Sequence, residues 1–240
     1  QMKATGEVMA IDRSFEAGLQ KAVRSLEIGG RSLLWEDPRT SGDPCEGALA
    51  PTDERLWSIM AALRRGADIM GLARKTGVDP WFLHKLANIV ALERRLLSEP
   101  MGPELLREAK RLGFSDEQVG ALADVLPERV RARRKEWGIR PVFKMVDTCA
   151  AEFDAATPYF YSTYEEENEA QPLPGDRALV IGSGPIRIGQ GIEFDYCSVH
   201  SVWALQQAGY RALIVNSNPE TVSTDFDTSD RLYFEPLDEE

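Results

Sequence analysis

Histidine, cysteine and long apolar segments are all scarce in this chain. Its 240 residues include 2 histidines and 3 cysteines. Cys45, Cys149 and Cys197 lie far apart without a CxxC pair, so neither a zinc site nor a disulfide framework is expected. His84 and His200 have no second histidine at ligand spacing, and we expect both to be structural. We therefore predict no metal site, and reduced cysteines that pack as small hydrophobic residues, as is usual in the cytoplasm.

Membrane and nucleic-acid partners are also disfavoured. No apolar segment approaches the roughly 18–20 residues that a membrane-spanning helix needs, and no signal peptide is visible. The formal net charge of -11 argues against nucleic acid, whose binding calls for a basic face. Hydrophobic residues make up 43% and charged residues 28%, which is ordinary for a soluble protein of one or two domains. We predict a cytoplasmic location.

Residues 51–138 have the pattern of consecutive helices, and this predicts an all-α bundle. Asp79-Pro80 and the capping box at 115–118 are helix starts, and Gly113 and Gly138 are stops. The apolar positions recur at helical spacing and predict the core. The predicted core residues are Leu56, Ile59, Leu63, Phe82, Leu86, Ile89 and Val90. A further amphipathic helix is expected at 14–26, followed by a loop at 29–50.

Two charged or aromatic segments follow. Residues 127–137 are strongly basic and form either a solvated helix face or a contact with an anion or partner. Residues 142–146 are β-like, and tyrosines at 159–164 precede an acidic, proline-bearing stretch that ends at 175. We expect this stretch to be a linker whose tyrosines pack on a neighbouring domain.

Residues 176–240 alternate between strand and helix patterns. A buried strand at 177–182 is followed by a helix at 197–208 and a second buried strand at 211–215, and 232–234 suggest a third strand. This order predicts a Rossmann-like α/β segment with parallel strands and a right-handed crossover.

The glycine-rich turn after the first strand does not fit the common nucleotide-binding motifs. A GxGxxG dinucleotide fingerprint that starts at Gly182 would need glycine where Arg187 stands, and no acidic residue follows the second strand. A Gly-Lys-Ser/Thr sequence is missing too, so the turn is not a phosphate-binding Walker loop. An oxidoreductase module is therefore disfavoured. The hypothesis that the protein is only a helical interaction scaffold would not explain residues 176–236.

Three long segments instead resemble, in the family's order, signatures of the large chains of carbamoyl-phosphate synthases. Residues 182–197 (GSGPIRIGQGIEFDYC) are similar to the segment that opens the second synthetase half. Residues 218–236 (NPETVSTDFDTSDRLYFEP) look like its companion motif, and residues 2–11 (MKATGEVMAI) are similar to the end of the first ATP-grasp half. The resemblance covers the whole chain, most weakly over residues 28–50.

The resemblance implies that the chain is an internal fragment with a defined domain order. Residues 1–27 would be the tail of the carboxyphosphate-forming half, and residues 28–157 the helical oligomerisation domain. Residues 158–175 would be a linker. Residues 176–240 would be the pre-ATP-grasp segment of the carbamoyl-phosphate-forming half.

The resemblance also implies an activity for the whole enzyme. The family makes carbamoyl phosphate, for pyrimidine and arginine synthesis, from bicarbonate, glutamine-derived ammonia and two ATP. The complete enzyme would need ATP, Mg or Mn, and K, and would work with a glutaminase small chain and the remaining large-chain domains. This fragment would need no cofactor, would hold no catalytic residue, and would self-associate through its helical domain.

The positions that match the wall of the family's carbamate tunnel are Gly191, Glu193 and Glu220. Glycine would permit a narrow bore, because it has no side chain. Buried carboxylates would repel carbamate if ionised, but desolvation could raise their pKa values and let them carry a proton.

Arg187, Asn216 and Asn218 are further polar candidates. They lie at strand or loop ends, where open α/β sheets place ligands. Capping and turn formation are the alternative roles for them, and both possibilities stay open at this point.

Overall fold

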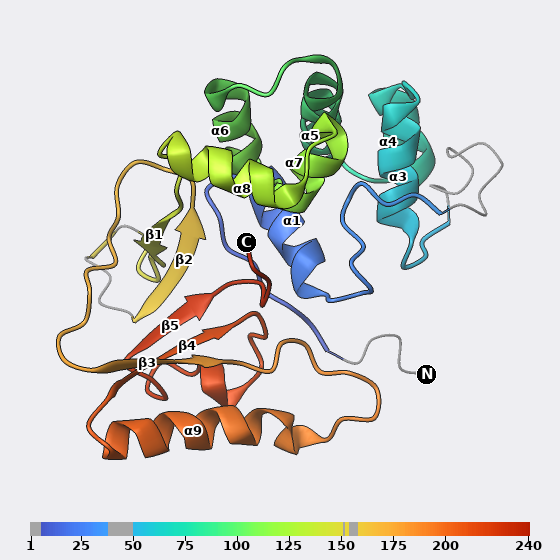
Figure 1. Ribbon diagram of the computed structural model, residues 1–240. Helices are drawn as coiled ribbons and strands as arrows, with labels where there is room; N and C mark the ends of the chain where they lie inside the picture. The colour runs from blue at the N-terminus through green and yellow to red at the C-terminus, as the bar shows by residue number, and fades with distance from the viewer. Residues whose placement is uncertain (1–5, 38–49, 151, 154–157) are drawn as a thin grey trace. The chain divides into compact units, whose positions relative to one another are not determined.

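The computed structural model describes residues 6–37, 50–150, 152–153 and 158–240 (Figure 1). Cys45, most of the predicted loop at 29–50 and the first residues of the 1–27 segment lie outside the described residues. The contacts within the chain define a helical unit and a sheet unit. The helical unit comprises residues 14–20 and 30–139, and the sheet unit comprises residues 1–13, 21–29 and 140–240.

The helical unit confirms the all-α prediction for the middle of the chain. Its helices are α1 (Phe15–Ser25), α3 (Arg55–Arg64), α4 (Ile69–Thr76), α5 (Pro80–Ser98), α6 (Pro103–Arg111), α7 (Asp116–Ala123) and α8 (Pro127–Glu136). The residues of α1 from Lys21 onward belong to the sheet unit. No helix among the described residues is long and apolar enough to cross a membrane.

The helix boundaries follow the local signals in the sequence. The Asp79 side chain accepts a hydrogen bond from the Trp81 N–H at 2.8 Å, and Pro80 opens α5. The capping box at α7 is confirmed: the Ser115 hydroxyl accepts from the Gln118 N–H, and the Gln118 side chain accepts from the Ser115 N–H. These local bonds satisfy backbone N–H groups that have no partner inside the helix.

Most of the predicted core residues are buried. Ile59, Leu63, Leu86, Ile89 and Val90 are all at most 5% exposed. Two of the predicted core positions are different. Leu56 is half-buried because the neighbouring Trp57 enters the core in its place.

Phe82 is the clear error in the predicted core, since it is 44% exposed. The buried stripe of α5 runs through Leu83, Leu86 and Val90, one position away from Phe82. Phe82 lies instead in an aromatic cluster at the start of α5, with ring centroids 5.4 Å from Phe15 and 5.0 Å from Trp81. Helical spacing alone does not distinguish these two adjacent stripes.

Leu86→Ala should lower the free energy of unfolding by about 3 kcal/mol, because it removes buried apolar atoms and leaves a cavity. The matched control is Leu97→Ala in the same helix, at a side chain that is 65% exposed. That control should stay within about half a kcal/mol of the parent chain. Urea denaturation followed by circular dichroism measures both changes, and equal losses would show that α5 buries a different face.

The basic helix α8 contributes to a buried charge cluster around Asp116. The Asp116 carboxylate lies 3.2 Å from Lys110 Nζ, 2.9 Å from Arg134 Nε and 3.5 Å from Arg131 Nε. Asp116, Lys110 and Arg134 have side chains that are at most 7% exposed. Helix α8 is therefore only partly the solvated face that its composition suggests.

The sheet unit contains a five-stranded sheet of order β1-β2-β5-β4-β3. The strands are β1 (Val142–Met145), β2 (Tyr159–Thr163), β3 (Arg177–Ile181), β4 (Arg211–Asn216) and β5 (Arg231–Phe234). β1 and β2 are antiparallel, whereas the other neighbouring pairs are parallel. The α/β prediction is therefore confirmed in its main feature. The sheet also includes β1 and β2, which lie before residue 176, and β2 falls in the predicted linker.

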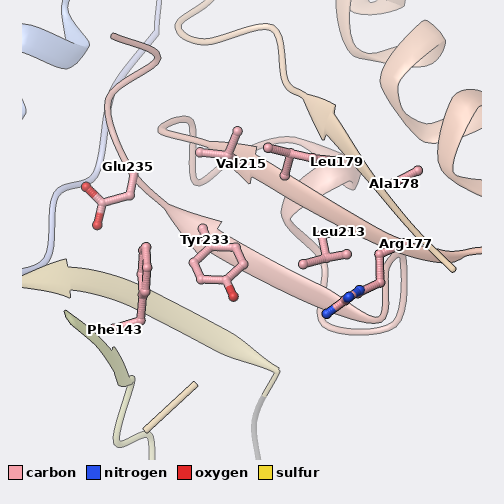
Figure 2. A pocket seen from close by; sticks show the side chains of 8 residues that line it. All are labelled: Phe143, Arg177, Ala178, Leu179, Leu213, Val215, Tyr233 and Glu235. Atoms are coloured by element: carbon pink, nitrogen blue, oxygen red, sulfur yellow. The ribbon is translucent and has the colours of Figure 1, made fainter. Parts of the chain in front are cut away.

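The two faces of this sheet are covered differently. Helix α9 (Tyr196–Gln207) lies along one face, where Val202 packs with Ala212, Ile214 and Leu232 (Figure 1). The opposite face carries an open, mainly apolar cavity of about 410 Å³ (Figure 2). Its lining residues are Phe143, Arg177, Ala178, Leu179, Leu213, Val215, Tyr233 and Glu235.

The end of α1 is held in the sheet unit by the buried ammonium of Lys21. Lys21 Nζ lies 3.1 Å from both the Asp12 and the Glu235 carboxylates and donates to the carbonyl of Ile11 at 3.1 Å. Burial raises the pKa of the Glu235 carboxyl, although Lys21 and the Ser162 N–H oppose this rise. Lys21 therefore joins the last residues of α1, which belong to the sheet unit, to the N-terminal segment and to the residues after β5.

Candidate functional site

The glycine-rich turn leaves β3 and packs directly against the end of β4. The Gly182 N–H donates to the Val215 carbonyl at 2.8 Å. A Cβ atom at position 182 would lie 2.5 Å from Cγ of Asn216, which is completely buried. Glycine is therefore required at 182 by the close approach of this side chain.

Asn216 connects the turn to the loop that follows β4. Its Oδ1 accepts hydrogen bonds from the Gly184 N–H at 3.1 Å and the Ser217 N–H at 2.9 Å. Its Nδ2 donates to Ser223 Oγ at 3.0 Å. A buried amide with both ends bonded in this way fixes the turn and the loop relative to each other.

Asn218 and Asp195 extend the same network. Asn218 Nδ2 donates to the Gly184 carbonyl at 3.3 Å, and its Oδ1 accepts from the Glu220 N–H at 2.9 Å. Asp195, at the start of α9, accepts from the Ser223 N–H at 2.8 Å. The structure thus uses Asn216 and Asn218 as turn-forming groups, and contact of either one with a ligand stays a prediction.

The structure brings Gly191 and Glu193 together at η1 (Ile192–Asp195), the short helix before α9. A Cβ atom on Gly191 would lie 2.6 Å from Cδ of Glu193. Glu220 lies in the loop before η2 (Val222–Thr224). These three residues come from the two loops that the Asn216 network holds, and their place in a tunnel wall stays a prediction.

The expected burial of the two glutamates is not found in this chain, and their burial within a complete enzyme stays a prediction. Both Glu193 and Glu220 are exposed, and Gly191 is half-buried. The reason is their position in turns beyond the ends of the strands, where few neighbouring elements can cover a side chain. The buried carboxylate in this region is that of Asp195, which is 5% exposed and which the sequence patterns did not single out.

Arg187 has a partner that the local pattern does not reveal. Its guanidinium forms an ion pair with Glu27, the residue two positions beyond α1, and its side chain is 57% exposed. Glu27 also lies against Gly184, where an added Cβ would be 2.7 Å from Glu27 Oε1. Two glycines that follow Glu27 could have indicated a helix end there, but no local signal pairs it with Arg187.

Among the described residues, no group of three or more His, Cys, Asp and Glu side chains could hold a metal ion. Cys197 is exposed and Cys149 is half-buried, and both are free thiols. The predicted burial of Cys197 is therefore wrong, because it lies on the outer side of α9. The loops in this region offer polar groups that could contact a ligand, and the Asn216 network holds these loops in position.

Two families match consecutive parts of the chain. Residues 7–138 match the carbamoyl-phosphate synthetase large chain, oligomerisation domain. Residues 175–240 match the carbamoyl phosphate synthase preATP-grasp domain. The first match covers the helical unit, and the second covers β3, α9, β4 and β5 together with the glycine-rich turn.

Curated relatives resemble the chain over its whole length. The carbamoyl phosphate synthase large chain of Thermomicrobium roseum is 60% identical over 243 residues, which is 100% of this chain and 22% of that protein. The large chains of a Thermoanaerobacter species and of Caldanaerobacter subterraneus are each 55% identical over 99% of this chain. The chain thus spans about a fifth of the length of these relatives.

Proposed function

The chain belongs to the carbamoyl phosphate synthase large-chain family, and from this premise we propose that it acts as an internal part of such a large chain. The observation that carries the proposal is the order of the two family matches, an oligomerisation domain followed by a preATP-grasp domain. Identity of 60% over the whole chain to one large chain supports the same role.

The proposed activity of the complete enzyme is synthesis of carbamoyl phosphate from bicarbonate, glutamine-derived ammonia and two ATP, in the cytoplasm. A glutaminase small chain would supply the ammonia, and the remaining large-chain domains would bind ATP with Mg or Mn and K. The sheet unit of this chain would contribute wall residues to the carbamate tunnel. The rigid network around Asn216 supports this role, because a conduit needs loops that keep their positions.

Self-association is the role we propose for the helical unit. Its family match is to an oligomerisation domain. It also exposes large apolar side chains, and such groups often mark protein contacts when they gather. These side chains are Met70, Trp81, Phe82, Leu97 and Leu126.

The structure gives a physical argument against a dinucleotide-binding module. In such a module the backbone N–H groups of the turn face a pyrophosphate. Here the Gly184 N–H is bonded to the Asn216 side chain, which also occupies the space beside Gly182. A purely helical scaffold explains only residues 14–20 and 30–139 and leaves the organised turn and loop without a role.

Two experiments test the proposed function. The first asks whether the isolated chain is inactive, and the second asks whether the same sequence supports activity within a complete large chain. The isolated chain, given ATP, magnesium, bicarbonate and ammonia, should release no ADP above background, because the proposed phosphorylation centres lie in other domains. A chimera in which it replaces the matching part of the Thermomicrobium roseum large chain should make carbamoyl phosphate. Robust turnover by the isolated chain, or a folded but inactive chimera, would contradict the proposal.

A further inference from the structure

Glu27 has an unusual backbone conformation for its residue type. Its φ angle is +51°, in the left-handed region where non-glycine residues are uncommon. Helices often end with a left-handed residue, and that residue is usually glycine. Gly29 and Gly30 follow closely with positive φ angles, so glycine is already used at this turn. A strained residue kept in such a place indicates that its side chain has a task.

The side chain of Glu27 lies between two parts of the glycine-rich turn. One carboxylate oxygen contacts the guanidinium of Arg187, and the other lies where a side chain on Gly184 would begin. Gly184 has a φ angle of +68°, so the turn needs glycine there for its backbone as well as for this contact. The two contacts place the negative charge of Glu27 directly on the turn.

Ion pairs fix the end of α1 and thereby set the position of the Glu27 side chain. Lys21, Arg24 and Glu27 follow each other at three-residue spacing, and each forms an ion pair within the sheet unit. Lys21 contacts Glu235, and Arg24 Nε lies 2.9 Å from Asp238. Glu27 is therefore the last of three charged contacts that attach this helix end.

We propose that Glu27 neutralises Arg187, so that anionic carbamate passes the glycine-rich turn without being retained there. The inference rests on the proposed tunnel role of this turn. A guanidinium binds carboxylate-like groups through two parallel hydrogen bonds, and carbamate carries such a group. An unpaired arginine at this turn would hold the labile anion, and the Glu27 carboxylate contacts Arg187 Nη2, one of the groups that would bind it. Glu27 is thus a positioning residue that acts through Arg187.

The test compares Glu27→Gln with the parent sequence in the large-chain chimera. Bicarbonate-dependent ATP hydrolysis by the first half, and ATP synthesis from ADP and carbamoyl phosphate by the second, should both remain within about two-fold. Coupled carbamoyl phosphate synthesis should fall about five-fold, and added sulfate should lower it further, because a sulfate ion bound to the unpaired guanidinium would obstruct the path of carbamate. Adding Arg187→Gln to this variant should remove both effects.

Glu27→Gly separates charge from backbone strain. Glycine adopts the left-handed conformation freely, so the melting temperature should stay the same or rise. Coupled synthesis should nevertheless fall and gain sulfate sensitivity, as in Glu27→Gln. The inference is overturned if Glu27→Gln behaves like the parent, if Arg187→Gln does not reverse its effects, or if both partial reactions fall with the coupled reaction. A parent chimera without coupled synthesis would instead refute the proposed function.

Discussion

Replacement of Gly191 by phenylalanine in the large-chain chimera should lower coupled carbamoyl phosphate synthesis by at least about ten-fold, because the ring would narrow the proposed conduit. Bicarbonate-dependent ATP hydrolysis should persist, and so should ATP synthesis from ADP and carbamoyl phosphate. The variant removes no catalytic group, so only passage between the two halves is affected. The measurement is all three rates on one preparation.

The backbone at Gly191 makes this experiment interpretable. Its φ angle is -95°, which any residue adopts without strain. The atoms that a Cβ atom would meet belong to the exposed carboxylate of Glu193, which can rotate away. Loss of function in Gly191→Phe would therefore not follow from a distorted turn.

Gly189→Phe is the matched control two residues away. Gly189 has a φ angle of +89° and open space around its Cβ direction, so phenylalanine there strains the turn without meeting a neighbour. This variant should lose stability and the second partial reaction together. If Gly191→Phe shows the same joint loss, Gly191 shapes the turn and the tunnel assignment fails.

Asp116→Ala should lower the free energy of unfolding of the helical unit by about 4 kcal/mol, because it leaves the buried cations of Lys110 and Arg134 without their shared carboxylate. Urea denaturation followed by circular dichroism measures the loss. The magnitude reflects the unpaired charges that remain rather than the net strength of the original contacts.

Glu117→Ala is the control for Asp116→Ala. Glu117 follows in the same first turn of α7, so both variants remove one acidic group from the start of the helix. Glu117 is exposed, and its replacement should change the stability by no more than about half a kcal/mol. Similar effects of the two variants would show that the interaction with the helix dipole, and not the buried cluster, accounts for the loss.

Local signals predicted the helices well because their causes are local. The capping box at Ser115 and the Asp79-Pro80 start each involve residues within one helical turn, and both are confirmed. The exposure of Phe82 depends on which stripe of α5 meets the rest of the bundle, and spacing within one helix does not contain that information.

Pairing in the sheet depends on residues that are distant along the chain. β2 lies beside β5, and Tyr159 pairs with Leu232. The short tyrosine-rich sequence of β2 has no local feature that predicts this pairing. β1 lies in the segment that the sequence predicts to be β-like, but the sequence does not assign it to the same sheet as β3, and β2 lies in the predicted linker.

The candidate site also combines features that local sequence patterns predict with features that depend on distant residues. The strand-turn pattern located the glycine-rich turn and the Asn216 loop, because a strand followed by glycines is a local feature. The partner of Arg187 lies 160 positions earlier, so no spacing rule finds Glu27. The exposure of Glu193 and Glu220 likewise depends on how the loops pack, which the motif alone does not specify.

The close fit between Gly182 and Asn216 restricts how this part of the molecule can evolve. A methyl group at 182 would overlap the Asn216 side chain, so position 182 cannot change first. A smaller residue at 216 would release the Gly184 N–H and Ser223, so position 216 cannot change first either. Each single-step intermediate is disfavoured, so the two positions should be inherited as one unit.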